Sequence, residues 1–191
     1  MIDFKKILET NLILMRPISL DDYESFIEIC SDKDLWIYFT SDLSNKDTLQ
    51  KWIETGEQET KNKKRLAFSI IDKQTNLQAG STSIGNISER DKRLEIGWTW
   101  LGREFQGKGI NDQAKYLLLK YCFEELDCER VEFKTDVLNK SARNALKRIG
   151  AVEEGVLRSH TLMTHNRRRD TIYYSILRNE WKNIKIKNNW P

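Results

Sequence analysis

The sequence predicts a mixed α/β fold in which one sheet is flanked by helices. Segments with period-two apolar alternation, typical of strands, are interspersed with segments of helical spacing. No internal repeat and no linker-like stretch divides them. We therefore expect a single domain over residues 1–191, with a core from about residue 12 to residue 181 and a polar, frayed C-terminal tail at 182–191.

Composition excludes several classes of protein. The chain has 191 residues, of which 39% are hydrophobic and 32% charged, which is typical of a globular protein with a core. No apolar run approaches the roughly 20 residues that cross a bilayer, and residues 1–7 lack a signal-peptide stretch, so we expect a cytoplasmic protein. The net charge of +3 is too small to predict nucleic-acid binding.

Cysteine and histidine spacing argues against a disulfide or a metal site. Cys30, Cys122 and Cys128 are odd in number and have no paired-ligand spacing. His160 and His165 are five residues apart, which is not a zinc spacing. We expect core or surface thiols and no bound metal.

The first half of the chain predicts one strand, two helices and a hairpin. Residues 12–16 form a short strand that Pro17 ends, and Ser19 caps the helix that follows. A second helix begins after Ser44 or Asn45 and contains Leu49, Trp52 and Ile53 at helical spacing. Two apolar segments then form the hairpin, at 65–72 and 77–87, with a turn at 73–76.

The second half centres on residues 94–126. Leu94, Ile96, Trp98 and Trp100 alternate as the buried face of a strand, which places Glu95 on the opposite face. After a turn with two glycines, a helical stripe runs to about residue 126; its apolar members are Ile110, Ala114, Leu117, Leu118, Tyr121 and Cys122.

The rest of the chain adds three strands and one helix. A strand at 131–137 precedes a helix that Asn139 caps and Gly150 ends, and two strands follow at 152–163 and 170–177. The total is about seven strands and four helices.

The glycine-rich turn at 106–111 is suited to phosphate, because unpaired N–H groups and the helix dipole meet at a helix start. A P-loop requires a hydroxyl residue, Ser or Thr, directly after its Gly-Lys pair, and none stands there in this sequence. A dinucleotide fingerprint requires a small residue where Asp112 stands, so the Rossmann interpretation is poor.

The hexapeptide 106–111, Gln-Gly-Lys-Gly-Ile-Asn, resembles the Q/R-x-x-G-x-G/A loop of the Gcn5-related N-acetyltransferases (GNAT family), departing from it at Asn111. The resemblance extends over 12–181, through the strand at 94–100, the segment 130–133, Asn139 followed by 145–151, the segment 154–158, and 169–171. This succession is similar to the ribosomal-protein N-acetyltransferase branch (RimJ/RimL-like), in which an Asn at the last loop position is familiar.

The resemblance implies the GNAT fold, a mostly antiparallel sheet with a splay between the fourth and fifth strands, and acetyl-CoA as cosubstrate. The acetyl-CoA would lie in that splay, with its pyrophosphate on N–H groups of the loop. The residues that would bind it are Trp98, Thr99, Trp100, Leu101, Gln106, Gly107, Lys108, Gly109, Ile110, Asn111, Asn139 and Arg143.

For catalysis, the resemblance implies Glu95 as a base acting through water; the alternative is a structural carboxylate paired with Arg93 or Lys134. Members of the family often have a serine that acts as the general acid at the position where Ala142 stands. Ser141, or else Tyr173 or Tyr174, would therefore act as the general acid here. Holding the amine and the thioester together contributes more to the rate of acetyl transfer than any single acid or base does.

The acceptor would be a primary amine, and the branch implies the α-amine of a protein or peptide. Two other hypotheses stay open at this point: a small-molecule acetyltransferase acting on a polyamine, an aminoglycoside or an amino acid, and an acetyl-CoA-binding module without strong catalysis. The sequence leaves open whether the chain is a monomer or a homodimer.

Overall fold

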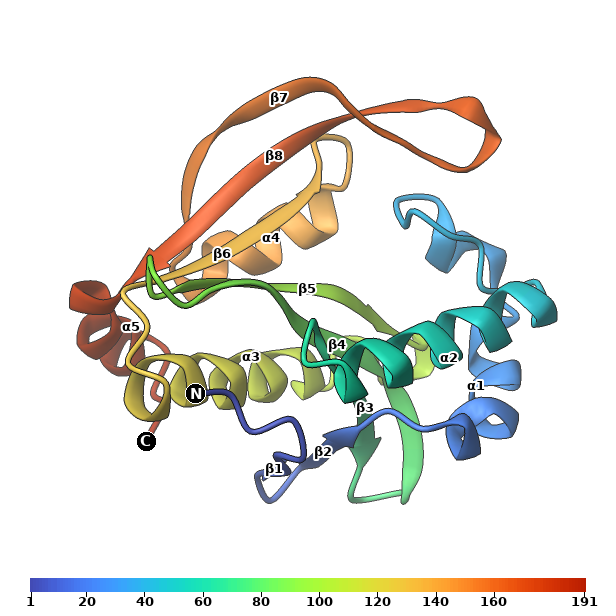
Figure 1. The fold of residues 1–191 in the computed structure, drawn as a ribbon, viewed down its shortest axis with the longest axis horizontal. Coiled ribbons are helices and arrows are strands. Elements are labelled where there is room, and N and C mark those ends of the chain that lie inside the picture. Colours follow the sequence, from blue (N-terminus) through green and yellow to red (C-terminus); the bar gives the residue numbers. More distant parts are fainter.

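The chain folds around one eight-stranded sheet with the strand order β1-β2-β3-β4-β5-β6-β8-β7 (Figure 1). The computed structural model describes the backbone of residues 1–191 and every side chain except that of His165, so the interpretation of His165 lies outside the described part. The strands are β1 (Leu8–Glu9), β2 (Ile13–Pro17), β3 (Leu66–Asp72), β4 (Leu77–Ser88), β5 (Arg93–Leu101), β6 (Arg130–Asp136), β7 (Val152–Leu162) and β8 (Arg168–Leu177). The α-helices are α1 (Tyr23–Cys30), α2 (Lys46–Lys61), α3 (Ile110–Lys120), α4 (Lys140–Ile149) and α5 (Trp181–Lys187).

Each helix and strand expected from the sequence is present, within a few residues at its ends. Two elements were missed. The two-residue strand β1 makes the sheet eight-stranded, because Leu8 pairs with Met15 at the edge of β2. The tail expected to fray instead forms α5, because Trp181 and Ile184 are buried at helical spacing. No helix in the described residues is long and apolar enough to span a membrane.

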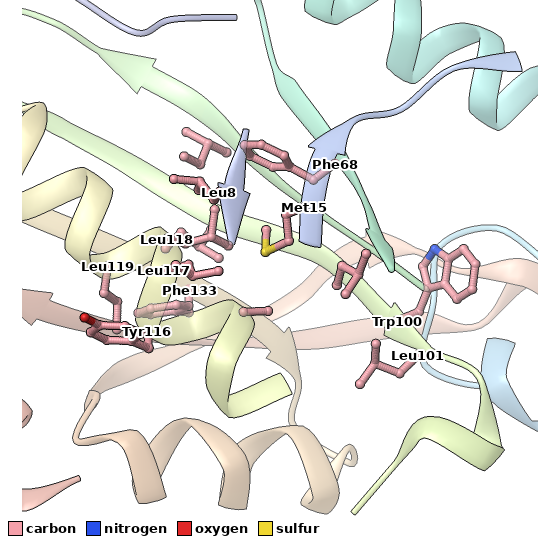
Figure 2. Packing of buried hydrophobic residues seen from close by; sticks show 14 of the residues in the cluster. Leu8, Met15, Phe68, Trp100, Leu101, Tyr116, Leu117, Leu118, Leu119 and Phe133 are labelled. Carbon is pink, nitrogen blue, oxygen red and sulfur yellow. The ribbon is translucent and has the colours of Figure 1, made fainter. Parts of the chain in front are cut away.

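The core joins the sheet to the buried side of α3. Leu117 and Leu118 of α3 lie close to the side chains of Leu8 and Met15 (Figure 2). Phe68 of β3 belongs to the same buried cluster. Burial of this apolar surface fixes α3, and therefore the loop before it, against the sheet.

The middle of β5 departs from a regular strand. Trp98 has φ +53°, and the pairing with β4 shifts register there, so Trp98 and Thr99 form a bulge opposite Thr82. The bulge reverses which face the following residues occupy. Trp100 therefore packs edge-on against Phe26 of α1, with ring centroids 5.0 Å apart, and does not continue the face of Leu94 and Ile96.

This corrects the sequence prediction that Leu94, Ile96, Trp98 and Trp100 share one face. Thr99 points towards α3, where Lys115 donates a hydrogen bond to it, whereas Trp98 and Trp100 point to the face covered by α1 and α2.

Strands β5 and β6 separate after a short parallel contact. They pair only from Arg93–Glu95 to Arg130–Glu132. Beyond it, β5 stays with β4 as far as Leu101, and β6 stays with β8 as far as Asp136. Figure 1 shows the two strands diverging. The backbone edge of β5 that faces β6 is thus left without a strand over residues 96–101.

The close approach of β4 and β5 requires glycine at position 80. A Cβ atom there would lie 2.1 Å from the backbone oxygen of Trp100 and 2.9 Å from the Cα of Leu101. Neither atom can move without displacing β5. We expect Gly80→Ala to lower the free energy of unfolding by about 3 kcal/mol, measured by urea denaturation. Gly155→Ala on β7, where a Cβ meets nothing within 4 Å, is the control; equal losses in the two variants would contradict this account.

Candidate active site

The glycine-rich loop presents a row of backbone donors at the start of α3. Gly107 and Gly109 have φ values of +74° and +79°, the left-handed conformation that turns successive N–H groups the same way. Gly109 is the N-cap and supplies no side-chain cap. Among the described residues, the N–H groups of 107–111 have no hydrogen-bond acceptor. The loop can therefore bind an anion with several N–H groups at once.

Side chains around the loop hold it in place. The amide Nε2 of Gln106 donates to the backbone oxygen of Leu101 over 3.0 Å, which ties the loop to the end of β5. Lys108 is exposed, with its Nζ 5.8 Å from the ring centroid of Phe105. Asp112, the one carboxylate in the first turn of α3, is paired with Arg148 of α4 at 2.7 Å. That pair reduces the repulsion Asp112 would exert on an anion bound at the loop.

The start of α4 contains the other residues proposed from the sequence. Asn139 caps the helix, because its Oδ1 accepts from the N–H of Ala142 at 3.0 Å. Arg143 donates to the Tyr174 hydroxyl and to the Val137 oxygen, at 3.2 and 2.9 Å. Ser141 is exposed, and no side-chain contact joins it to Glu95 in the described residues.

The two tyrosine candidates occupy different environments. Tyr174 is fully buried, and its hydroxyl is used by Arg143 and Glu153. Tyr173 is half-buried and lies beside Lys134 in the β6–β8 register. It therefore belongs to the same face of the sheet as Glu95.

Glu95 lies where β5 and β6 begin to separate. Its side chain is buried, and its Oε2 accepts from the amide of Asn86 at 2.7 Å and from Lys134 Nζ at 2.9 Å. The ion pair with Lys134 is the structural alternative considered from the sequence. Lys134 Nζ also lies 6.0 Å from the ring centroid of Trp98, so Trp98, Lys134 and Glu95 form one cluster.

A buried lysine of α3 contacts the middle of β5 from the opposite face of the sheet. Lys115 is 5% exposed, and its Nζ donates to Thr99 Oγ1 at 2.8 Å. No carboxylate among the described residues pairs with it. Burial lowers the pKa of Lys115 to about 7.

The pKa of Lys115 predicts how stability depends on pH. Between about pH 7 and pH 10.5 the unfolded chain binds this proton more tightly than the folded chain, so the contribution of Lys115 to the free energy of unfolding rises with pH in that window. Below pH 7 the full cost of burying the charge applies. We expect Lys115→Met to stabilise the ligand-free protein below pH 7 by an amount on the order of a few kcal/mol, and the difference to close towards pH 10.5.

Urea denaturation at several pH values checks this prediction, with Lys120→Met on the exposed side of α3 as the control. The prediction would be contradicted if the free energy of unfolding changed with pH in the same way in wild type and in Lys115→Met.

Three residues were not predicted as site residues from the sequence: Asn86, Lys115 and Arg169, although 169–171 belongs to the family resemblance. Asn86 has a positive φ of +48° at the end of β4, a conformation that asparagine tolerates well, but its partner Glu95 lies on the next strand. Nothing in the pattern indicates that Lys115 or Arg169 is buried. The three cysteines are buried, and the described residues contain no cluster that could hold a metal.

The opening between β5 and β6 has hydrogen-bonding groups that suit a coenzyme A molecule. The unpaired edge of β5 over 96–101 can hydrogen-bond the amides of an extended chain. The N–H groups of 107–111 suit a pyrophosphate at the end of that edge. Two shallow surface hollows, one beside Arg178 and one beside α2, contain none of these residues.

The model of the acetyltransferase (GNAT) domain family matches residues 12–152. The chain is 39% identical over 106 residues to the "Putative ribosomal N-acetyltransferase YdaF" of Bacillus subtilis (strain 168), an alignment covering 56% of this chain and 57% of that protein. The chain thus spans just over half the length of this relative.

Solved structures agree with the family match. A "putative acetyltransferase" from T. thermophilus has a TM-score of 0.88 and 29% identity, covering 99% of this chain and 98% of that one. Microcin C7 self immunity acetyltransferase MccE, solved with acetyl-CoA and AMP, has a TM-score of 0.78 and 25% identity, covering 88% and 93%. This chain therefore belongs to the GNAT family and is an N-acetyltransferase that uses acetyl-CoA.

Proposed function

We propose that this enzyme acetylates the N-terminal α-amine of a protein or peptide, with ribosomal proteins as the candidate class. The observation that carries the proposal is the position of Glu95, a buried carboxylate at the point where β5 and β6 separate. A carboxylate there can receive a proton from an amine that approaches the acetyl donor from the α1–α2 face.

In the proposed site the chain binds and orients both substrates. The N–H groups of Gly107, Lys108, Gly109, Ile110 and Asn111 hold the pyrophosphate, and the unpaired edge of β5 at Trp98, Thr99, Trp100 and Leu101 holds the pantetheine amides. Asn139 and Arg143 flank that arm from α4. Bound acetyl-CoA supplies the acetyl group as a reactive thioester.

Glu95 takes a proton from the acceptor ammonium through a water molecule. Lys134 and Asn86 fix the orientation of its carboxylate by binding the same oxygen. A proton for the departing thiolate would come from Ser141 or from Tyr173. Tyr173 has the advantage of lying on the face of Glu95.

An α-amine suits this arrangement because its pKa of about 7.7–8.0 leaves a sizeable neutral fraction at pH 7, whereas lysine at about 10.4 does not. The printed name of one relative, "Putative ribosomal N-acetyltransferase YdaF", supports a protein acceptor. A small amine is the alternative acceptor.

Thiol release from acetyl-CoA, measured over a panel of peptides and small amines, tests the proposal. We expect turnover of peptides with a free α-amine and none with acetyl-blocked copies. Turnover of polyamines, aminoglycosides or amino acids but not of peptides would support the small-molecule alternative. Binding of acetyl-CoA with no turnover of any acceptor would overturn the proposal.

We also propose a cytoplasmic location, which is in keeping with such acceptors. The mass of the enzyme in solution tests whether it is a homodimer.

A further inference from the structure

Arg169 on β8 is a buried cation that has no ionic partner among the described residues. Its side chain is 7% exposed, and its Nε donates to Thr171 Oγ1 at 3.0 Å. No carboxylate among the described residues forms an ion pair with it, and its two terminal nitrogens have no acceptor there. Buried charges in proteins are normally paired, because an unpaired charge loses its hydration without compensation.

The neighbouring charges on this face are already matched. Glu95 is paired with Lys134, and the buried Asp136 is paired with Arg167. Among the described residues, Arg169 therefore adds one unmatched positive charge to the face of the sheet that carries the proposed catalytic carboxylate. Burial lowers the pKa of Arg169, and the charges of Asp136, Tyr173 and Glu95 oppose that shift.

Other side chains hold Arg169 in position. Thr171, which accepts from Arg169, also contacts His160 Nδ1 at 3.1 Å, and the His160 ring packs edge-on against Tyr173 with centroids 6.1 Å apart. Thr161 of β7 pairs with Arg169 in the sheet register. The guanidinium is thus held on the face of Glu95, and its terminal nitrogens have no acceptor in the described part of the chain. Arg presents these donors as a planar fork that matches a carboxylate or a phosphate.

We propose that Arg169 binds an anionic group of the acceptor, a carboxylate or a phosphate carried close to the amine that is acetylated. This inference rests on the proposed function, and it narrows the acceptor to an acidic one. The polyamine and aminoglycoside alternatives become poor acceptors, because they would bring cations to an unmatched cation. An acidic residue near a peptide N-terminus, or the α-carboxylate of an amino acid, supplies the required group.

Matched acceptor pairs test the inference. Serine and serinamide differ only in the α-carboxylate. The peptide amides Ser-Asp-Ala-Ala and Ser-Asn-Ala-Ala differ only in a side-chain carboxylate, and phosphoserine in place of the Asp tests a phosphate. We expect kcat/KM for at least one anionic member to exceed that of its neutral partner at least tenfold. The pair that shows the preference identifies the source of the anion.

The variants Arg169→Gln and Arg169→Lys assign the preference to this side chain. Hydrogen bonds to charged groups contribute about 1.5–3 kcal/mol, so we expect Arg169→Gln to lower kcat/KM for the anionic acceptor about 10- to 100-fold and to change the neutral acceptor less than about twofold. Arg169→Lys should restore part of the loss. Arg168→Gln, the neighbouring exposed arginine, is the matched control.

Two further measurements separate binding from a structural role. Calorimetric titration of the CoA-saturated enzyme with the acetylated anionic peptide should show the same loss of affinity in Arg169→Gln. Thermal unfolding of that variant should not fall, because it removes an unpaired buried charge. Two results would overturn the inference while leaving amine acetylation intact. One is that Arg169→Gln lowers kcat/KM equally for both members of every acceptor pair, and the other is that wild-type enzyme shows no preference for the anionic member of any pair. If wild type acetylates no amine at all, the proposed function itself fails.

Discussion

Glu95→Gln is expected to lower kcat for a peptide acceptor about 100-fold while leaving the affinity for acetyl-CoA unchanged. The amide keeps the shape of the side chain but cannot accept a proton. The defect should be largest below the pKa of the acceptor amine, about 7.7–8.0 for an α-amine, and should shrink above it, because the neutral amine then needs no base. Steady-state thiol release as a function of pH measures both effects.

Glu132→Gln is the matched control for this experiment. Glu132 lies beside Glu95 in the β5–β6 register, and its carboxylate is bound by Arg130 and Arg93. We expect that variant to retain its rate and pH profile. A Glu95→Gln enzyme with wild-type rate and pH profile would show that Glu95 serves only to pair with Lys134.

Gly109→Val is expected to weaken CoA binding about 10- to 100-fold. A β-branched residue is strongly disfavoured at φ +79°, so the chain would leave this conformation and turn its N–H groups away from a bound pyrophosphate. Space is not the cause, since a Cβ at position 109 would meet only Leu12, at 3.8 Å. Isothermal titration with CoA measures the change.

Gly155→Val provides the control. It also places valine at a glycine of positive φ, +159°, but on the exposed strand β7 and away from the loop. Thermal unfolding of both variants separates loss of binding from loss of folding. Unchanged CoA affinity in folded Gly109→Val would place the pyrophosphate elsewhere.

Local sequence patterns were sufficient to predict most of the fold. Caps such as Ser19, Asn45 and Asn139 and the αL glycine Gly150 act within a few residues of the helix ends they define, and the structure confirms them. The strand β1 was missed because two residues, Leu8 and Glu9, are too few for a periodic signal.

The bulge in β5 shows where periodicity fails. Apolar residues alternate without interruption from Leu94 to Trp100, yet the chain changes face at Trp98. The pattern conceals the change because both faces of the sheet are buried here, one against α3 and the other against α1 and α2. An alternation of apolar residues identifies a strand, but it assigns the faces correctly only where no bulge intervenes.

The candidate site was predictable only in part for a related reason. The glycine loop is a local motif, and the structure gives it the left-handed glycines and unpaired N–H groups that its spacing suggested. The surroundings of Glu95 depend on contacts between residues far apart in sequence, such as Lys134 on the next strand. The burial of Lys115 and Arg169 without carboxylate partners in the described residues has no local signature, because both residues are ordinarily exposed.

Hydrogen exchange of the backbone amides, compared with and without saturating CoA, tests the placement of the cofactor most directly. We predict slower exchange in two segments, residues 96–101 of β5 and residues 107–111 of the loop. CoA would accept hydrogen bonds from the loop amides and from those β5 amides that lie on the edge facing β6, which no strand pairs there. Exchange in β7, which lies at the far edge of the sheet, should change little. Unchanged exchange in both segments at saturating CoA would contradict the assignment of the cofactor to the opening between β5 and β6.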